Sequence, residues 1–270
     1  MEMMFMSDSD RTIGHFSGFS SVWHGGYYEG DPLDPLGSSK YRRLGYISIL
    51  HAVYQVCVKP YIKKNTVALE IGPGRGAWTK GMLDAKEVWC LDAKSKADNK
   101  IDEYLGNPSN LIYHLVTDYS CSMLPDDKFD YVFSFGCLCH VPWEGVCEYA
   151  ENLFPKMKSG CTAIWMVADY EKRNKVANNF STYDIYARTL PPFAKRMMEF
   201  WNRHTKLRHM GPDHEVPLDK DNDNQKEVAG RWYHSGAGRT AAMLRELGYE
   251  IVSEDLGLLP RDALVHFRKP

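Results

Sequence analysis

The chain has 270 residues, of which 44% are hydrophobic and 25% are charged, and its formal net charge is −2. This composition is typical of a globular protein with one domain of ordinary to large size. A nearly balanced charge gives no overall attraction to nucleic acid or anionic lipid, so a partner of either kind would need a local patch.

The N-terminal segment, Met1-Glu-Met-Met-Phe-Met-Ser-Asp8, lacks the basic region and long apolar core of a secretory signal. No apolar run approaches the roughly 20 residues that a membrane-spanning helix needs. The seven cysteines are an odd number without the spacing of a disulfide framework, which favours a reducing compartment. We therefore expect a cytoplasmic protein without a membrane span.

Residues 1–40 are predicted to form an N-terminal arm or lid, and residues 41–270 the main domain. The stretch from Trp23 to Pro32 is dense in aromatic residues and glycines. It could order over a ligand, with Tyr28 as a contact, or it could be an arm packed on the surface of the domain.

From residue 41 onward, the sequence predicts helices alternating with strands, which indicates a parallel sheet with right-handed crossovers. The predicted helices span about 41–61, 76–84, 95–105, 143–158 and 239–247. The predicted strands span 66–71, 87–92, 111–116, 129–135, 161–168, 249–254 and 263–268. We expect an α/β fold with a Rossmann-like, seven-stranded, mostly parallel sheet, a closing antiparallel hairpin and helices on both faces.

Residues 170–233 break this alternation and are predicted to be a substrate-side insertion after the fifth strand. We expect a helix at about 190–205 and a flexible loop at about 210–228. The insertion is rich in aromatic residues and histidines. These side chains could form a lid suited to a sugar, whose apolar faces stack and whose hydroxyls pair with polar groups, or they could build a small core of their own.

The most informative motif is Val67-Ala-Leu-Glu-Ile-Gly-Pro-Gly-Arg-Gly76, a buried strand followed by three alternating glycines. Gly72, Gly74 and Gly76 allow a tight turn in which the backbone comes close to a ligand. The spacing differs from the G-x-G-x-x-G of dinucleotide-binding folds. Glu70 would repel a pyrophosphate but favour a cationic ammonium or sulfonium group. The alternative is a purely structural loop.

The second strand ends in Asp92, and an acid at this place is typical of a site for a ribose-bearing ligand. With the glycine turn, this pattern resembles the first motif of class I S-adenosylmethionine-dependent methyltransferases. The resemblance covers roughly residues 40–170 and 235–270. It implies S-adenosylmethionine as the cofactor, bound by Glu70, the three glycines, Asp92 and Ala93.

The same resemblance implies cofactor contacts after the third and fourth strands. Asp118, with its neighbour Tyr119, falls where the family has an acid that faces the adenine amino group. Phe135 and Gly136, after the fourth strand, are expected to line the same site. The alternative for Asp118 is an aspartate that caps a local turn.

The segment from Phe133 to Pro142 carries the candidate catalytic residue. Many small-molecule methyltransferases have a Leu-His-His-type segment here, and this chain has Cys139 in place of the first histidine and His140 at the second. A histidine suits a hydroxyl acceptor because its ordinary pKa lies near neutrality. The alternative is a histidine at a helix start that bonds to the backbone.

Two metal hypotheses arise from the sequence. Asp118, Asp169 and His140, which are also the catalytic candidates, could hold Mg²⁺ against a diol, because hard cations favour carboxylate oxygen. Cys137-Leu-Cys139-His140 resembles a zinc clip, but it lacks the usual spacing and a second ligand pair. We expect no structural metal.

The glycine motif, the Trp23–Pro32 stretch and the segment before His140 together resemble methyltransferases encoded with glycan-building glycosyltransferases. This resemblance implies O-methylation of a sugar in a polysaccharide or glycoconjugate. The alternatives are an N-methyltransferase for a small amine or a protein, and a cofactor-binding protein without catalysis. A nucleic-acid methyltransferase acting on base amines would be expected to carry Asn/Asp-Pro-Pro-Tyr/Phe after the fourth strand and a basic stripe. The chain has neither, so no nucleic-acid partner is expected.

Overall fold

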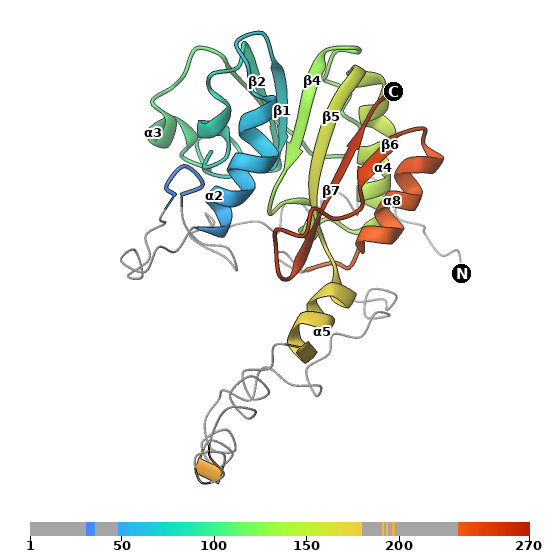
Figure 1. The fold of residues 1–270 in the computed structure, drawn as a ribbon. Helices are drawn as coiled ribbons and strands as arrows, with labels where there is room; N and C mark the ends of the chain where they lie inside the picture. Colours follow the sequence, from blue (N-terminus) through green and yellow to red (C-terminus); the bar gives the residue numbers. More distant parts are fainter. Residues whose placement is uncertain (1–30, 36–47, 180–190, 192, 194–195, 198–231) are drawn as a thin grey trace, which may run out of the picture.

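The computed structural model describes residues 31–35, 48–179, 191, 193, 196–197 and 232–270. Its centre is a seven-stranded sheet with the order β3-β2-β1-β4-β5-β7-β6 (Figure 1). The strands are β1 (Val67–Ile71), β2 (Glu87–Asp92), β3 (Leu111–Leu115), β4 (Phe129–Ser134), β5 (Met157–Ala168), β6 (Glu250–Ser253) and β7 (Asp262–Arg268). Strands β1 to β5 pair in parallel, whereas β7 is antiparallel to β5 and β6. The predicted fold class is confirmed.

Helices cover both faces of this sheet (Figure 1). The α-helices are α2 (Ile49–Val53), α3 (Ile101–Leu105), α4 (Trp143–Leu153), α5 (Tyr170–Asn179) and α8 (Ala237–Glu246). There is also a π-helical turn, η2 (Tyr54–Val58). The 3₁₀ turns are η3 (Lys59–Tyr61), η4 (Thr79–Met82), η5 (Leu138–His140) and η6 (Phe154–Lys156). Within the described part of the chain, no helix has the length and hydropathy that crossing a membrane requires.

The hydrophobic core lies in two layers, one on each face of the sheet. All five residues of β1 are buried, and alternate residues face opposite layers. Leu69 belongs to the layer that α4 and α8 cover, together with Val146 and Leu244. Ala68 belongs to the layer under α2 and η2, together with Leu50. Burial on both faces explains why the central strands read as continuous apolar runs.

Three predicted helices are shorter in the structure. The helix expected at 76–84 is only the 3₁₀ turn η4, because Gly76 has a φ of +90°, which a right-handed helix cannot include. The helix expected at 95–105 is reduced to α3, because Lys100 has a φ of 51° in the left-handed region. The helix expected at 143–158 ends at Leu153, close to Pro155, and β5 already begins at Met157.

Several sequence predictions lie outside the described residues. They are most of the arm at 1–40 including Tyr28, the first part of the helix at 41–61, the helix at 190–205 and the loop at 210–228. The described part of the arm, residues 31–35, is fixed to the domain beside α2. There His51 Nδ1 lies 2.9 Å from the Pro32 carbonyl, and the N–H of Ser48 donates to the carbonyl of Pro35 at 3.0 Å.

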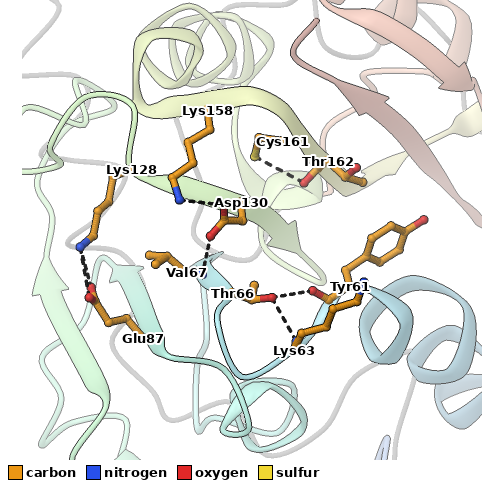
Figure 2. Close-up of polar contacts among 10 residues, drawn as sticks. All are labelled: Tyr61, Lys63, Thr66, Val67, Glu87, Lys128, Asp130, Lys158, Cys161 and Thr162. Atoms are coloured by element: carbon orange, nitrogen blue, oxygen red, sulfur yellow. Dashed lines mark hydrogen bonds and ion pairs between the residues drawn. The ribbon is translucent and has the colours of Figure 1, made fainter.

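A polar network closes the amino-terminal edge of the central strands (Figure 2). One carboxylate oxygen of Asp130 accepts the N–H of Val67 at 2.8 Å, and the other pairs with Lys158 Nζ at 2.7 Å. Asp130 thus ties together the starts of β1, β4 and β5. Beside it, Lys128 pairs with Glu87 at 2.9 Å. These four charged side chains fix the amino-terminal edge of the sheet, and ligands of open α/β sheets bind at the opposite, carboxyl edge.

Candidate functional site

The register of the parallel strands aligns the candidate residues along the carboxyl edge of the sheet. Ile71, the last residue of β1, pairs with Leu91 of β2 and with Ser134 of β4. The glycine loop after β1, the end of β2 and the segment after β4 therefore meet at the carboxyl edge. The strand order reverses at β1, because β2 lies on one side and β4 on the other. A ligand of an open α/β sheet binds outside such a switch point.

The three glycines of the loop have positive φ values of +73°, +52° and +90°, but they differ in how much space surrounds the position of a Cβ atom. A Cβ on Gly72 would overlap with the Cβ and Sγ atoms of Cys137. A Cβ on Gly76 would lie 2.9 Å from Ile101 and 3.0 Å from Leu105 of α3. A Cβ on Gly74 would meet nothing within 4 Å. Only at Gly74 is the backbone open to a ligand; the other two glycines allow close packing within the protein.

Asp92 lies at the end of β2 and faces this open position. Its Oδ2 atom accepts the N–H of Gly74 at 3.0 Å, and its Oδ1 atom accepts the N–H of Lys94 at 2.8 Å. Burial raises the pKa of Asp92, while these hydrogen bonds and one from the Asn99 side chain act in the opposite direction. A carboxylate offers about four acceptor positions, so Asp92 can still accept from a ribose hydroxyl. Its neighbour Ala93 is half-buried at the same edge.

Glu70 lies below the loop and is only 2% exposed. Its Oε2 atom accepts the hydroxyl of Thr79 at 2.6 Å. Burial raises the pKa of Glu70 to about 8, and the charge of Asp92 adds to this rise. Glu70 is therefore held inside the fold behind the glycine loop, and its direct contact with a ligand stays a prediction.

Asp118 and Tyr119 follow β3 but differ in their surroundings. Asp118 is exposed, and its Oδ1 atom accepts both the N–H and the hydroxyl of Ser120, at 2.9 and 2.6 Å. The ring of Tyr119 is buried against Tyr149, with ring centroids 5.0 Å apart. A cofactor could meet Tyr119 only through its backbone. The hydrogen bonds of Asp118 are those of an aspartate that caps a local turn, which was the alternative to cofactor binding.

The segment after β4 forms the other side of the site. Gly136 has a φ of +72°, is exposed, and has open space where a Cβ would lie. The preceding Phe135 packs on Trp78, with ring centroids 4.5 Å apart. The hydroxyl of Ser134 donates to the Ile71 carbonyl at 3.1 Å and fixes this segment to the end of β1. Gly74 and Gly136 thus offer two stretches of open backbone, one on each side of the switch point.

His140 is the last residue of the 3₁₀ turn η5 and is half-buried. The turn is closed by a hydrogen bond of 2.8 Å from the His140 N–H to the Cys137 carbonyl. The carbonyl of Cys139 accepts the N–H of Tyr233 at 2.9 Å. His140 therefore lies between the cofactor side, after β4, and the chain that returns from the insertion.

Asp169 caps two helices. Its Oδ1 atom accepts the N–H of Lys172 in the first turn of α5 at 2.9 Å, and its Oδ2 atom accepts the N–H of Ala237, the first residue of α8, at 3.0 Å. Both oxygens are engaged with backbone groups, so we assign Asp169 a structural role. Within the ranges that the structure describes, no three His, Cys, Asp or Glu side chains gather around a possible metal ion. The grouping of Asp118, Asp169 and His140 that a Mg²⁺ site would need is therefore not supported.

The return segment, residues 232–237, begins at the end of the insertion predicted at 170–233 and lies at the same edge of the sheet as η5. Tyr170 stacks on His234 and packs on Trp232, with ring centroids 4.8 and 4.6 Å apart. The N–H groups of Ser235 and Gly236 both donate to the carbonyl of Ala168, the last residue of β5. The run of small residues Ser235-Gly236-Ala237-Gly238 before a predicted helix is the sequence signal that could have indicated this turn.

Residues 69–158, about a third of the chain, match the family model of a methyltransferase domain. This range contains the open glycine, Asp92, Asp118 and His140. The structure also resembles solved structures over most of its length, with sequence identities that relate the folds alone. The fold is that of a class I S-adenosylmethionine-dependent methyltransferase.

Three solved structures illustrate this methyltransferase fold. A Listeria monocytogenes protein classed with S-adenosylmethionine-dependent methyltransferases has a TM-score of 0.54 at 14% identity, over 82% of this chain and 98% of that one. An S-adenosylmethionine-dependent methyltransferase from Mesorhizobium loti has a TM-score of 0.52 at 16% identity, over the same shares of the two chains. DhpI in complex with SAH has a TM-score of 0.52 at 13% identity, over 97% and 96%. No curated protein matches the chain. The matched domain and the shared fold support a methyltransferase enzyme.

Proposed function

We propose that the protein is an S-adenosylmethionine-dependent O-methyltransferase whose acceptor is a hydroxyl of a sugar in a glycan or glycoconjugate. The observation that carries the methyltransferase assignment is the pairing of the open backbone at Gly74 with the Asp92 carboxylate at the switch point of the sheet. The sugar hydroxyl is the finer part of the proposal. It is supported by the position of His140 beside the return segment.

The cofactor residues that we propose follow from this geometry. Asp92 accepts the ribose hydroxyls, and Ala93 lies next to it. The backbone at Gly74 and Gly136 allows close approach from two sides, with Phe135 beside Gly136. Asp118 is exposed at the same edge and is proposed to meet the adenine. Gly72, Gly76, Glu70 and Tyr119 support the site through the packing and hydrogen bonds described above.

S-adenosylmethionine, when bound, supplies an electrophilic methyl group on a sulfonium. The chain positions the acceptor so that its hydroxyl oxygen forms the new bond to the methyl carbon in line with the breaking carbon–sulfur bond, whose electron pair stays on sulfur. His140 takes the hydroxyl proton on a ring nitrogen and passes it to solvent. The aromatic surface of the return segment helps to exclude water. No metal ion is needed for this transfer.

The N-terminal arm at 1–40, including Tyr28, and the insertion at 170–233 are proposed to complete the acceptor side. The segment that returns from the insertion supports this arrangement, because Tyr233 bonds to η5 and His234 lies beside the end of β5. The cytoplasm is the proposed compartment. All seven cysteines are free thiols, which suits a reducing environment.

The proposal is tested by incubating the protein with methyl-labelled cofactor and a panel of free sugars, glycans, amines and RNA, with and without a chelator. We expect label in sugars or glycans, none in RNA, and no effect of the chelator. Label only in amines would replace the sugar hydroxyl by an N-methylation acceptor. Cofactor that does not bind in calorimetry would overturn the methyltransferase assignment itself.

A further inference from the structure

Helix α8 begins at the carboxyl edge of the sheet, beside the proposed acceptor site. Its N-cap residue is Gly236, which has no side chain to accept a hydrogen bond from the first turn. The first intrahelical hydrogen bond runs from Thr240 to Gly236, so the N–H groups of Ala237, Gly238 and Arg239 precede it. The carboxylate of Asp169 accepts the N–H of Ala237. The N–H groups of Gly238 and Arg239 have no acceptor among the described residues, and both residues are exposed.

Two buried hydroxyl groups lie at the same terminus. Ser235 and Thr240 are both 0% exposed, and neither hydroxyl has a hydrogen-bond partner in the part of the chain that the structure describes. They occupy the positions before the N-cap and four residues after it. In many helices these positions hold apolar side chains that pack against each other. Here they hold two buried hydroxyls, and these do not bond to each other. A buried hydroxyl without a partner is unfavourable, so this pair indicates a polar group that binds from outside the fold.

Arg239 adds a positive charge at this terminus. Its guanidinium lies over the ring of Trp143, the first residue of α4, at 3.8 Å from the ring centroid. Among the residues that the structure describes, it forms no ion pair, whereas Arg245 on the last turn of the same helix pairs with Glu254 at 2.7 Å. Stacking on Trp143 holds the Arg239 side chain at the edge while its N–H donors stay available.

We propose that this terminus of α8 binds an anionic group, a phosphate or a carboxylate, on the methyl acceptor. The donors are the N–H groups of Gly238 and Arg239, the guanidinium of Arg239, and the hydroxyls of Ser235 and Thr240. The positive end of the helix dipole favours a negative charge at this position. The charge of Asp169 opposes it, but that carboxylate is already bonded to two backbone N–H groups.

This site deepens the proposed function, on which it rests, because it selects a charged sugar over a neutral one. The N–H of Tyr233 bonds to the Cys139 carbonyl, so the start of α8 follows directly on a segment fixed beside His140. An acceptor held at α8 by its anionic group can present a hydroxyl toward His140. The anion then positions the acceptor and takes no part in the methyl transfer.

The experiment measures calorimetric binding of inorganic phosphate, glucose 6-phosphate, glucuronate and glucose, each with and without S-adenosylhomocysteine. We expect at least one anionic probe to bind about tenfold or more tightly than glucose, since hydrogen bonds to charged groups are worth that much. The phosphate and glucuronate arms distinguish the two anions. Arg239→Gln should remove the preference, and the control Arg245→Gln should keep it. Equal binding of anionic and neutral probes, or an Arg239→Gln variant with the full preference, would overturn the proposal.

A second pair of variants separates binding from folding. Thr240→Val and Ser235→Ala remove buried hydroxyls without partners, so the melting temperature should stay the same or rise while anion affinity falls severalfold. Unchanged anion affinity in both variants would exclude the hydroxyls. S-adenosylhomocysteine binding is read in every sample. Its absence would refute the proposed function, while the probes titrated alone would still test the anion site.

Discussion

The N–H of Gly74 donates a hydrogen bond of 3.0 Å to Asp92, so the glycine loop after β1 is held against the end of β2. This bond joins the two strands at the one glycine of the loop where an added Cβ would meet no atom of the described residues within 4 Å. The loop and the acid therefore act as one unit, and substitutions in either should affect cofactor binding in ways that differ from their effect on stability.

Alanine substitution should separate the roles of the glycines. Gly72→Ala should destabilise the fold strongly, because it adds an overlap with Cys137 to the cost of a positive φ, about 1–2 kcal/mol. Gly74→Ala should lower the free energy of unfolding only by the cost of a positive φ. It should reduce cofactor affinity tenfold or more, on the order of one lost close contact. Urea unfolding and calorimetric titration with S-adenosylhomocysteine measure the two effects. Gly106→Ala, at a φ of +75° with open space around it, is the control for strain alone. Equal cofactor affinity in the Gly74 and Gly106 variants would contradict the assignment of Gly74.

Asp92→Ala should weaken cofactor binding roughly 10- to 100-fold, since a charged acceptor typically contributes 1.5–3 kcal/mol. It should also free the N–H of Gly74. Asp92→Asn should fall between wild type and alanine, because one amide oxygen remains as an acceptor. The exposed Asp98, on the following turn, provides Asp98→Asn as a control that should leave affinity unchanged. Affinity that is equal in all three variants would mean that Asp92 serves the loop alone.

His140→Ala should lower kcat by about 10²- to 10⁴-fold, the usual range for a lost general base, and leave cofactor affinity unchanged. The measurement is initial rate against pH with a saturating acceptor found in the labelling panel. A variant with wild-type kcat would show that positioning alone suffices for transfer.

Glu70 should make stability depend on pH. Its pKa is raised from 4.5 to about 8 in the fold, so between these values the folded state holds a proton that the unfolded state has lost. The stabilisation from this group is fully present below 4.5 and is lost as the pH rises through about 8. Unfolding free energy should therefore fall by up to a few kcal/mol between pH 5 and pH 8. Glu70→Gln should reduce this slope. An identical slope in the variant would show that Glu70 is ionised in the fold.

Asp169→Ala should destabilise the protein by roughly 1–3 kcal/mol, because two helix N-termini lose their acceptor and both of these hydrogen bonds are partly buried. Asp169→Asn should cost less, since asparagine also caps helices. Thermal unfolding measures this difference, and kcat per folded molecule should stay close to wild type. A large loss of kcat in a fully folded Asp169→Asn variant would return Asp169 to the catalytic site.

The strands could be predicted because each is a short apolar run between turn residues, and the site followed from the spacing of Gly74 and Asp92. Other features depend on contacts between residues far apart in the sequence. Gly72 is a glycine because Cys137, 65 positions further along the chain, fills the space of a side chain. Likewise, the carboxylate of Asp169 accepts the N–H of Ala237, which lies 68 positions further along. Gly76, at which the helix predicted after β1 would start, has a positive φ and packs without a side chain against α3, 25 and more positions away. Local patterns carry no information about such contacts.

The stacking of Tyr170 on Trp232 and His234 has an evolutionary consequence. The chain leaves the sheet and rejoins it at the same point, and the Tyr170 hydroxyl also bonds to the Trp232 carbonyl. Closing a loop costs entropy that grows only with the logarithm of its length, so segments of very different size can be exchanged between these anchors at little thermodynamic penalty. The junction therefore lets the segment between these anchors vary in length and composition while the sheet itself stays the same.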